Sequence, residues 1–210
     1  MRLFLLCVLF ASASWAAQVQ FSLSATVTQI DPLLAGSFST GQAVIGLYTF
    51  ESLTADSASA PESGVFFNAG TLFSVATGAL KFVAGAVNIT VSDTALVDIY
   101  RVEGSGVAGD ALGAFQISSL VLALTDNTVP INGLASDALP LVPPALANFD
   151  VRTLTLVFVN GLTVASVVAR VDSLTGSSVP EPGLAVPLAL VLVLAGVTRR
   201  RGTRGAPKSL

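Results

Sequence analysis

Apolar and polar residues alternate along the segment QVQFSLSATVTQI, Gln18–Ile30. Every second residue from Val19 to Val27 is apolar, and the residues between them are Gln, Ser or Thr. A period of two places successive side chains on opposite faces of a strand, so this pattern predicts a half-buried β-strand. We expect the strand to end at Asp31-Pro32, which is a turn sequence.

Further segments rich in β-branched or aromatic residues follow, and we predict a strand at each of them. They are Val44–Phe50, Val65–Phe67, Leu72–Ala76, Leu80–Val91, Leu96–Val102, Ala114–Leu124, Val151–Val159 and Leu162–Val171. Asn160-Gly161 is the clearest hairpin, because both residues tolerate the positive φ of a type I′ turn. Closely spaced strands with short turns predict an all-β single domain, an antiparallel β-sandwich or jelly roll.

Two segments between the predicted strands need separate interpretation. SDALPLVPPALANF contains Pro140, Pro143 and Pro144, so we expect a long connection whose leucines pack over one open end of the sandwich. Gly104–Gly109 matches the G-x-G-x-x-G pattern of dinucleotide sites. No helix is predicted after these glycines to hold a pyrophosphate, so we interpret them as a flexible hairpin loop.

The interior of the chain, residues 18–178, is acidic. It contains twelve Asp and Glu residues against four Lys and Arg residues, which gives a formal net charge of −8, compared with −3 for the whole chain. Nucleic-acid binding requires a basic patch, so this composition argues against nucleic acid as a partner.

Histidine is absent from the chain, and the only cysteine is Cys7. Ser-His-Asp and Cys-His catalysis, disulfides and zinc sites with nitrogen or sulfur ligands are therefore excluded for the interior. Glycoside hydrolysis by two carboxylates is left open, although no cluster of aromatic residues accompanies the acids. We expect a protein that is not an enzyme and has no cofactor, with a carboxylate-based glycosidase as an alternative.

Calcium is the cofactor that the composition excludes least, because it binds oxygen ligands only. Candidate ligands are Asp93, Asp98, Glu103 and Asp126. No twelve-residue EF-hand loop and no acidic repeat surrounds them, which favours solvated loop acids over a metal site.

The N-terminal segment is typical of a secretory signal peptide, with Arg2 followed by the apolar run Leu3–Ala11. Small residues, Ser14 and Ala16, occupy the −3 and −1 positions and predict cleavage after Ala16. We therefore expect export by the Sec machinery and removal of residues 1–16 by signal peptidase.

An apolar run of 14 residues, Leu184–Val197, lies just before Arg199, Arg200 and Arg201. It is shorter than the roughly 20 residues that usually cross a bilayer. Long arginine side chains can reach the interface from a short span, and positive charges favour the cytoplasmic side. We expect one membrane helix at residues 184–198, with the arginines as its cytoplasmic stop.

The residues before this run are Val179, Pro180, Glu181 and Pro182, with Gly183 after them. The motif, the short apolar helix and the arginine cluster, in that order, resemble the PEP-CTERM sorting signal. The resemblance covers about Val179–Arg201. It implies a Gram-negative host and processing by an exosortase, an integral-membrane cysteine transpeptidase, which would release the domain to the cell surface or into extracellular polymer.

Two interior segments, GLYTFESLTAD (Gly46–Asp56) and SDALPLVPPALANFD (Ser136–Asp150), resemble recurring parts of PEP-CTERM proteins with no settled activity. We predict a signal peptide at 1–16, a β-sandwich domain at 17–176, a sorting signal at 177–201 with its motif at 179–183, and a cytoplasmic tail at 202–210.

The expected function is that of an exported surface or matrix protein associated with exopolysaccharide. We expect it to be held first in the inner membrane, with its β domain in the periplasm. The alternative is a calcium-dependent polysaccharide-binding module.

Overall fold

Nine β-strands and two short 3₁₀ helices make up residues 17–178, the part of the chain that the computed structural model describes. The elements are β1 Gln18–Ile30, η1 Pro32–Leu34, β2 Ala43–Glu51, β3 Ser63–Gly70, β4 Leu72–Thr77, β5 Leu80–Asp93, β6 Asp98–Gly109, β7 Gln116–Asp126, η2 Leu146–Asn148, β8 Val151–Asn160 and β9 Thr163–Ser178. Every strand predicted from the sequence is present. β9 extends past its predicted end at Val171 as far as Ser178.

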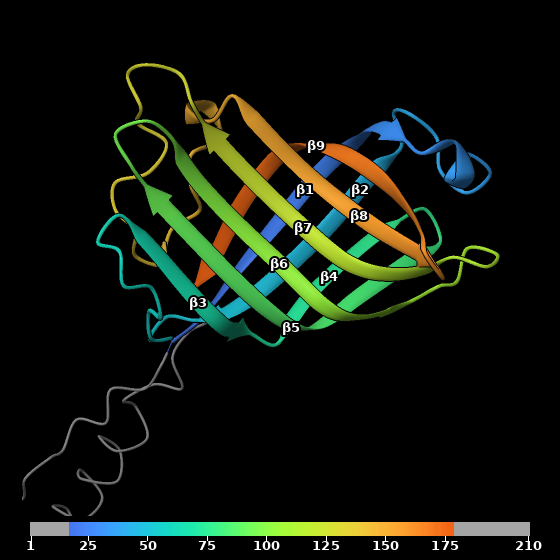
Figure 1. Ribbon diagram of the computed structural model, residues 1–210, viewed down its shortest axis with the longest axis horizontal. Helices are drawn as coiled ribbons and strands as arrows, with labels where there is room; N and C mark the ends of the chain where they lie inside the picture. Colours follow the sequence, from blue (N-terminus) through green and yellow to red (C-terminus); the bar gives the residue numbers. More distant parts are fainter. Residues whose placement is uncertain (1–16, 179–210) are drawn as a thin grey trace, which may run out of the picture. The chain divides into compact units, whose positions relative to one another are not determined.

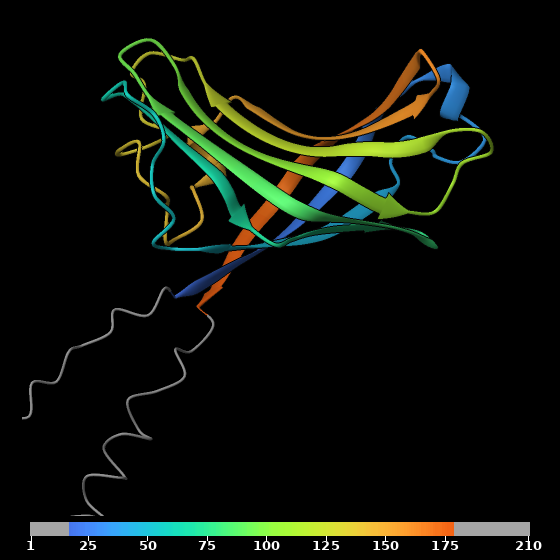
Figure 2. The same ribbon diagram turned by 60° about the horizontal axis from the view of Figure 1, so that its bottom comes forward.

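The strands form one antiparallel sheet that closes on itself (Figures 1 and 2). Its order is β3-β5-β4-β2-β1-β9-β8-β7-β6, and β6 pairs in addition with β5. This additional ladder runs from Phe82↔Gly109 to Asp93↔Asp98. Eight strands therefore form a closed barrel, and β3 is an extra strand that pairs only with β5.

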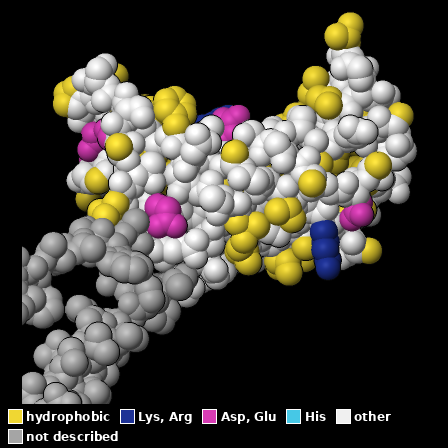
Figure 3. Space-filling view, turned by 90° about the horizontal axis from the view of Figure 1, so that it is seen from below, with side chains coloured by type: hydrophobic (Ala, Val, Ile, Leu, Met, Phe, Trp, Pro, Cys, Tyr) yellow, Lys and Arg dark blue, Asp and Glu magenta, His cyan; other side chains and the backbone are white. Residues whose placement is uncertain are grey.

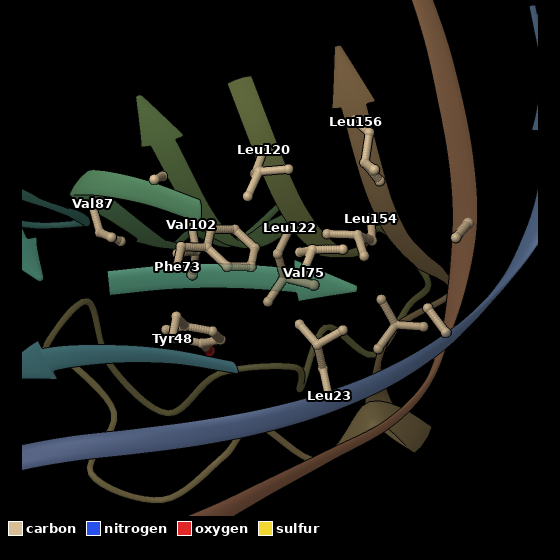
Figure 4. Close-up of a cluster of buried hydrophobic side chains, with 14 of the residues drawn as sticks. Leu23, Tyr48, Phe73, Val75, Val87, Val102, Leu120, Leu122, Leu154 and Leu156 are labelled. Atoms are coloured by element: carbon tan, nitrogen blue, oxygen red, sulfur yellow. The ribbon is translucent and has the colours of Figure 1, made fainter. Parts of the chain in front are cut away.

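Alternate side chains of the strands point into the barrel and form its core. In β1, Phe21, Leu23 and Val27 are buried, whereas Ser22 and Ser24 between them are partly exposed. Figure 4 shows side chains from different strands meeting in the interior: Leu23, Tyr48, Phe73, Val75, Val87, Val102, Leu120, Leu122, Leu154 and Leu156. Burial of this apolar surface is the main favourable contribution to folding.

β5 changes its neighbour halfway along its length. Residues 80–84 pair with β4, whereas residues 87–92 pair with β3. At the same place the buried positions of β5 change from even-numbered to odd-numbered residues. Gly85 lies at this corner, and the adjoining part of β6 contains Gly106, whose φ of +62° is a conformation that residues with a Cβ rarely adopt.

The all-β antiparallel class predicted from the sequence is confirmed, but the sandwich or jelly-roll architecture is corrected. A sandwich has two separate sheets packed face to face, whereas here the ladders join all strands into a single sheet that the β5–β6 pairing closes. The period-two pattern identifies the buried face of each strand and not its neighbours. A small filled barrel and a sandwich therefore produce the same pattern.

Gly104–Gly109 is part of β6, so its interpretation as a hairpin loop was wrong. An ideal Cβ on Gly104 would lie 2.6 Å from the Cβ atom of Ala84 and 3.2 Å from Cδ1 of Phe73. Glycine at this position lets β6 approach the core closely.

The hairpin predicted at Asn160-Gly161 is present, with its turn displaced by one residue. Asn160 pairs with Thr163, so the two central residues are Gly161 and Leu162. Gly161 has a φ of +58°, while the φ of Leu162 is not positive. Positive φ at the first central residue alone is the pattern of a type II′ turn rather than type I′.

Loops cover both ends of the barrel. Residues 127–150, here called the capping loop, cover the end at which β1 begins and β9 finishes (Figure 1, left). Leu139 and Phe149 of this loop are buried in the core, as expected for leucine packing over an open end, although Leu141 is exposed. At the opposite end Phe38 packs against Phe158, with ring centroids 5.8 Å apart.

Several sequence predictions concern residues outside 17–178. They are the signal peptide at 1–16 with its cleavage at Ala16, the motif Val179–Gly183, the helix at 184–198, the arginines Arg199–Arg201 and the tail at 202–210. Within residues 17–178, no helix has the length and apolar character needed to cross a membrane.

One polar contact lies inside the apolar core. The hydroxyl groups of Tyr48 and Tyr100 are 3.0 Å apart, and both residues are fully buried. Burial, followed by the influence of Tyr100, raises the pKa of the Tyr48 phenol well above its ordinary value. Both phenols are therefore neutral, and the hydrogen bond between their hydroxyl groups gives each buried oxygen a partner.

We predict that Tyr100→Phe destabilises the protein by about 1–3 kcal/mol, because the Tyr48 hydroxyl then has no partner in the core. The double variant Tyr48→Phe with Tyr100→Phe should recover most of that loss, since no buried hydroxyl is left unpaired. Urea denaturation of the wild type, both single variants and the double variant measures this coupling. A double variant less stable than either single one would contradict the mutual pairing.

Candidate functional site

The capped end of the barrel collects most of the acidic residues of the domain. Eight of the twelve interior acids lie at the strand ends and loops there: Glu51, Asp56, Glu62, Asp93, Asp98, Asp126, Asp137 and Asp150. Among the four basic residues, only Arg152 at the start of β8 is near this end. The face of the barrel in Figure 3 carries few charged side chains, which are scattered among uncharged ones that include hydrophobic patches.

Three of the calcium candidates lie side by side on consecutive strands. Asp98, the first residue of β6, pairs with Asp93 of β5 on one side and with Asp126 of β7 on the other. Directly opposite residues in an antiparallel ladder have Cβ atoms roughly 5 Å apart. The fourth candidate, Glu103, lies elsewhere on β6 and forms an exposed ion pair with Arg101 at 3.1 Å.

Asp126 is fully buried and holds the start of the capping loop. Its Oδ1 accepts hydrogen bonds from the backbone N–H of Thr128 at 3.0 Å and from the Thr128 hydroxyl at 2.8 Å. Its Oδ2 accepts from the backbone N–H of Asn132 at 2.9 Å. These donors, the Asn132 N–H first, lower the pKa of Asp126 and keep it ionised.

Asp98 is also buried, with 1% of its surface exposed, but it has fewer partners. Its Oδ2 accepts a hydrogen bond from the backbone N–H of Leu134 in the capping loop at 2.8 Å. Its Oδ1 has no hydrogen-bond partner among residues 17–178, and it is the only buried side-chain oxygen or nitrogen there with none. A buried unpaired carboxylate oxygen is costly, so this atom needs an explanation.

Asp93 is the neighbour that faces Asp98 across the ladder. Burial and then the charge of Asp98 raise the pKa of Asp93 above its ordinary value. Asp137 and Glu62 raise it further by repulsion. Asp93 is therefore easier to protonate than an ordinary aspartate.

The carboxylates of this end are not arranged as a metal centre. In the described part of the chain, no three His, Cys, Asp or Glu side chains are grouped in a way that could hold a metal ion. Sequence analysis identifies Asp93, Asp98 and Asp126 as candidate calcium ligands. The fold places them together, but the oxygens of Asp126 already accept hydrogen bonds from the capping loop.

Asp56 blocks the free edge of β3. Its Oδ1 accepts hydrogen bonds from the backbone N–H groups of Ala58 and Val65, both at 2.8 Å, and the Ser57 N–H donates to the carbonyl of Val65. The N–H groups of Ala58 and then Val65 lower the pKa of Asp56. An exposed strand edge is a site for unwanted pairing, and this loop occupies it.

Two shallow hollows lie beside the capping loop. One has a volume of about 370 Å³ and is lined by Ser52, Thr54, Asp56, Phe66, Asp137, Ala138, Leu139 and Leu141. The other has a volume of about 290 Å³ and is lined by Thr128, Val129, Pro130, Asn132, Ala147, Asn148, Phe149 and Asp150. Their aromatic residues, Phe66 and Phe149, are buried, so neither hollow offers a ring face on which a sugar could stack.

Sequence analysis missed Glu62, Asp137 and the anchors of the capping loop. Asp137 lies in the proline-rich connection and Glu62 in the loop before β3, and neither belongs to a motif. They approach Asp93 only because the loops fold over the same end of the barrel. An excess of acids in the predicted loops was the available signal, and it did not identify which acids meet.

No family model matches this chain, and neither a curated protein nor a solved structure matches it at a significant level.

We predict that Asp126→Asn lowers the melting temperature by several degrees at neutral pH, because the amide oxygen replaces only one of two accepting oxygens. The pKa of Asp126 is lowered in the folded state, so its contribution is present at neutral pH and is lost as the pH falls through that lowered pKa. Thermal melting from acidic to neutral pH measures both effects.

Asp110→Asn is the matched control for this prediction. Asp110 lies in an exposed loop at the other end of the barrel and accepts one backbone hydrogen bond, from the Lys81 N–H at 2.9 Å. The Asp110→Asn substitution should change the melting temperature much less than Asp126→Asn does. Equal losses in the two variants would contradict the anchoring role of Asp126.

Proposed function

We propose that this protein is an exported, non-enzymatic component of the cell surface or extracellular matrix, anchored briefly in the inner membrane and then processed by an exosortase. The observation that carries this proposal is the order of the motif Val179–Gly183, the apolar run Leu184–Val197 and the arginines Arg199–Arg201. The PEP-CTERM resemblance of these residues implies sorting rather than a particular chemistry.

The interior of the barrel supports a structural role. Large side chains from all around the ring, among them Phe21, Phe73, Phe82 and Phe158, fill the interior and are fully buried. A small barrel whose interior is filled by side chains is a packed core and not a ligand cavity. In residues 17–178 the two hollows described above lie at the capped end, beside the loops and not within the ring.

The outer surface also supports this role. The outward residues of β1 are Gln, Ser and Thr, and Ser24 of β1 hydrogen-bonds to Ser173 of β9 at 2.7 Å. The net charge of residues 18–178 is negative. Negative net charge keeps a protein soluble and repels anionic polysaccharide, which suits a filler of an extracellular matrix.

The two chain ends of the barrel fit a tethered intermediate. Val19 near the start of β1 pairs with Ser178 at the end of β9, so the chain enters and leaves the barrel at the same place. The signal peptide and the sorting motif that we propose are continuous with these two residues. Val19 and Ser178, which precede or follow the proposed processing points closely in the sequence, therefore lie at the same end of the barrel.

We predict that replacing Arg199–Arg201 by alanines prevents correct sorting, because the proposed membrane segment then lacks its cytoplasmic stop. Replacement of the same residues by lysines keeps the charge and should preserve sorting.

In a second variant, Glu181→Ala should block processing. Glu62→Ala removes an acid from the β domain instead and should not block it.

Fractionation of native cells and mass spectrometry of the mature chain ends measure both steps. The expected mature wild-type protein starts after Ala16 and ends within or near Val179–Gly183. Equal delivery of the wild type and the alanine variants to the cell surface would refute the sorting proposal. The barrel would then need another role.

A further inference from the structure

Asp93 and Asp98 form a carboxyl pair at the capped end that no basic side chain of residues 17–178 neutralises by an ion pair. They face each other where β5 and β6 meet, and Asp98 is almost completely buried. The ion pairs formed by residues 17–178 are Arg101–Glu103 and Arg170–Asp172, and neither involves this pair.

The charged groups facing Asp93 from the surrounding elements are all acidic. They are Asp98 of β6, Asp137 of the capping loop and Glu62 of the loop before β3, whose carbonyl accepts the Asp93 N–H at 3.0 Å. Asp126 of β7 lies on the other side of Asp98. Two adjacent carboxylates in such surroundings cannot both be ionised without a large cost.

We propose that Asp93 and Asp98 are a proton-binding site, in which one proton shared by the two carboxyl groups locks the capping loop over the end of the barrel. The proton resides on Asp93, whose carboxyl group donates to the otherwise unpaired Oδ1 of Asp98. This accounts for the buried oxygen that has no partner. It also leaves Oδ2 of Asp98 free to accept the hydrogen bond from the Leu134 N–H.

The geometry links this proton to the capping loop. Asp98 holds the loop through Leu134, and Asp126 holds it two residues earlier through Asn132. Between these contacts, a Cβ on Gly133 would lie 2.8 Å from the Phe149 ring and 3.0 Å from the Cβ atom of Asp126. The loop backbone therefore lies directly against the strand ends, and repulsion between Asp93 and Asp98 acts beneath its anchor.

The sign of the pH dependence follows from the direction of the shift. The pKa of Asp93 is raised in the folded state, so this carboxyl group binds its proton more tightly in the folded protein than in the unfolded chain. The contribution of Asp93 to stability therefore falls as the pH rises through that raised pKa. Asp126 has the opposite sign, because its pKa is lowered and its contribution is lost towards acidic pH. The capping loop is therefore held most firmly at mildly acidic pH, between the lowered pKa of Asp126 and the raised pKa of Asp93.

Melting of the full chain as a function of pH tests the proposal, with Asp93→Asn as the variant. Asparagine at this position donates an N–H to Asp98 at every pH and imitates the protonated acid. We expect the wild type to lose several degrees between mildly acidic and neutral pH. Asp93→Asn should melt several degrees above the wild type at neutral pH and match it at mildly acidic pH.

Glu103→Gln is the matched control, because it removes one carboxylate from the same strand in an exposed ion pair. It should leave the wild-type pH profile unchanged. Two results would overturn the proposal. One is a melting temperature of Asp93→Asn that changes with pH in parallel with that of the wild type. The other is a melting temperature of Asp93→Asn below that of the wild type at neutral pH.

Hydrogen exchange of two capping-loop amides gives a readout that does not depend on any variant. In the wild type, protection of the Leu134 N–H, which donates to Asp98, should fall several-fold relative to that of the Asn132 N–H, which donates to Asp126, as the pH rises to neutral. A constant ratio of the two would count against the shared proton.

Melting with added calcium tests whether the carboxyl groups of Asp93 and Asp98 bind a proton or a metal ion. Melting at neutral pH with added calcium or with a chelator should give the same temperature for the wild type. A calcium-dependent rise in the wild type that is absent from Asp93→Asn would assign the pair to a metal ion and overturn the proton site.

Discussion

The ladder between β5 and β6 is the interaction on which the rest of the structure depends. It joins the two sides of the sheet from Phe82↔Gly109 to Asp93↔Asp98, so no strand of the ring keeps an open edge. The extra strand β3 has such an edge, and Asp56 covers part of it by accepting the Val65 N–H. Closure forces the inward side chains into one enclosed volume. It also creates two ends, each of which must be covered by a loop.

The positions of the strands could be predicted from the sequence because burial on one face imposes a period of two. The way the sheet closes could not, since it depends on which strands pair and on the corner at Gly85 and Gly106. Gly104–Gly109 was misread for a related reason. Glycines occur both in loops and where a strand must approach the core, and only the neighbours of Gly104, such as Ala84, distinguish the two cases.

For the candidate site, the sequence identified residue types and not their arrangement. Strand pairing does bring the candidates Asp93, Asp98 and Asp126 side by side, whereas Glu103 lies farther along β6 in an exposed ion pair with Arg101. The calcium hypothesis rests on counting oxygen ligands and stays a prediction. Asp126 already accepts backbone hydrogen bonds, so it has fewer oxygen lone pairs to offer a cation.

The contrast between Asp126 and Asp98 shows how a loop decides the chemistry of neighbouring acids. Like charges directly opposite in a ladder are unfavourable, so adjacent aspartates require compensation. The capping loop supplies Asp126 with three donors from two residues, Thr128 and Asn132, and Asp98 with one donor, from Leu134. Asp126 can therefore stay ionised in a buried place, while Asp98 needs a further donor. Asp93, which lies opposite Asp98 in the ladder, can provide this donor only as a neutral acid. The loop that closes the barrel thus makes one of its own anchors depend on a proton.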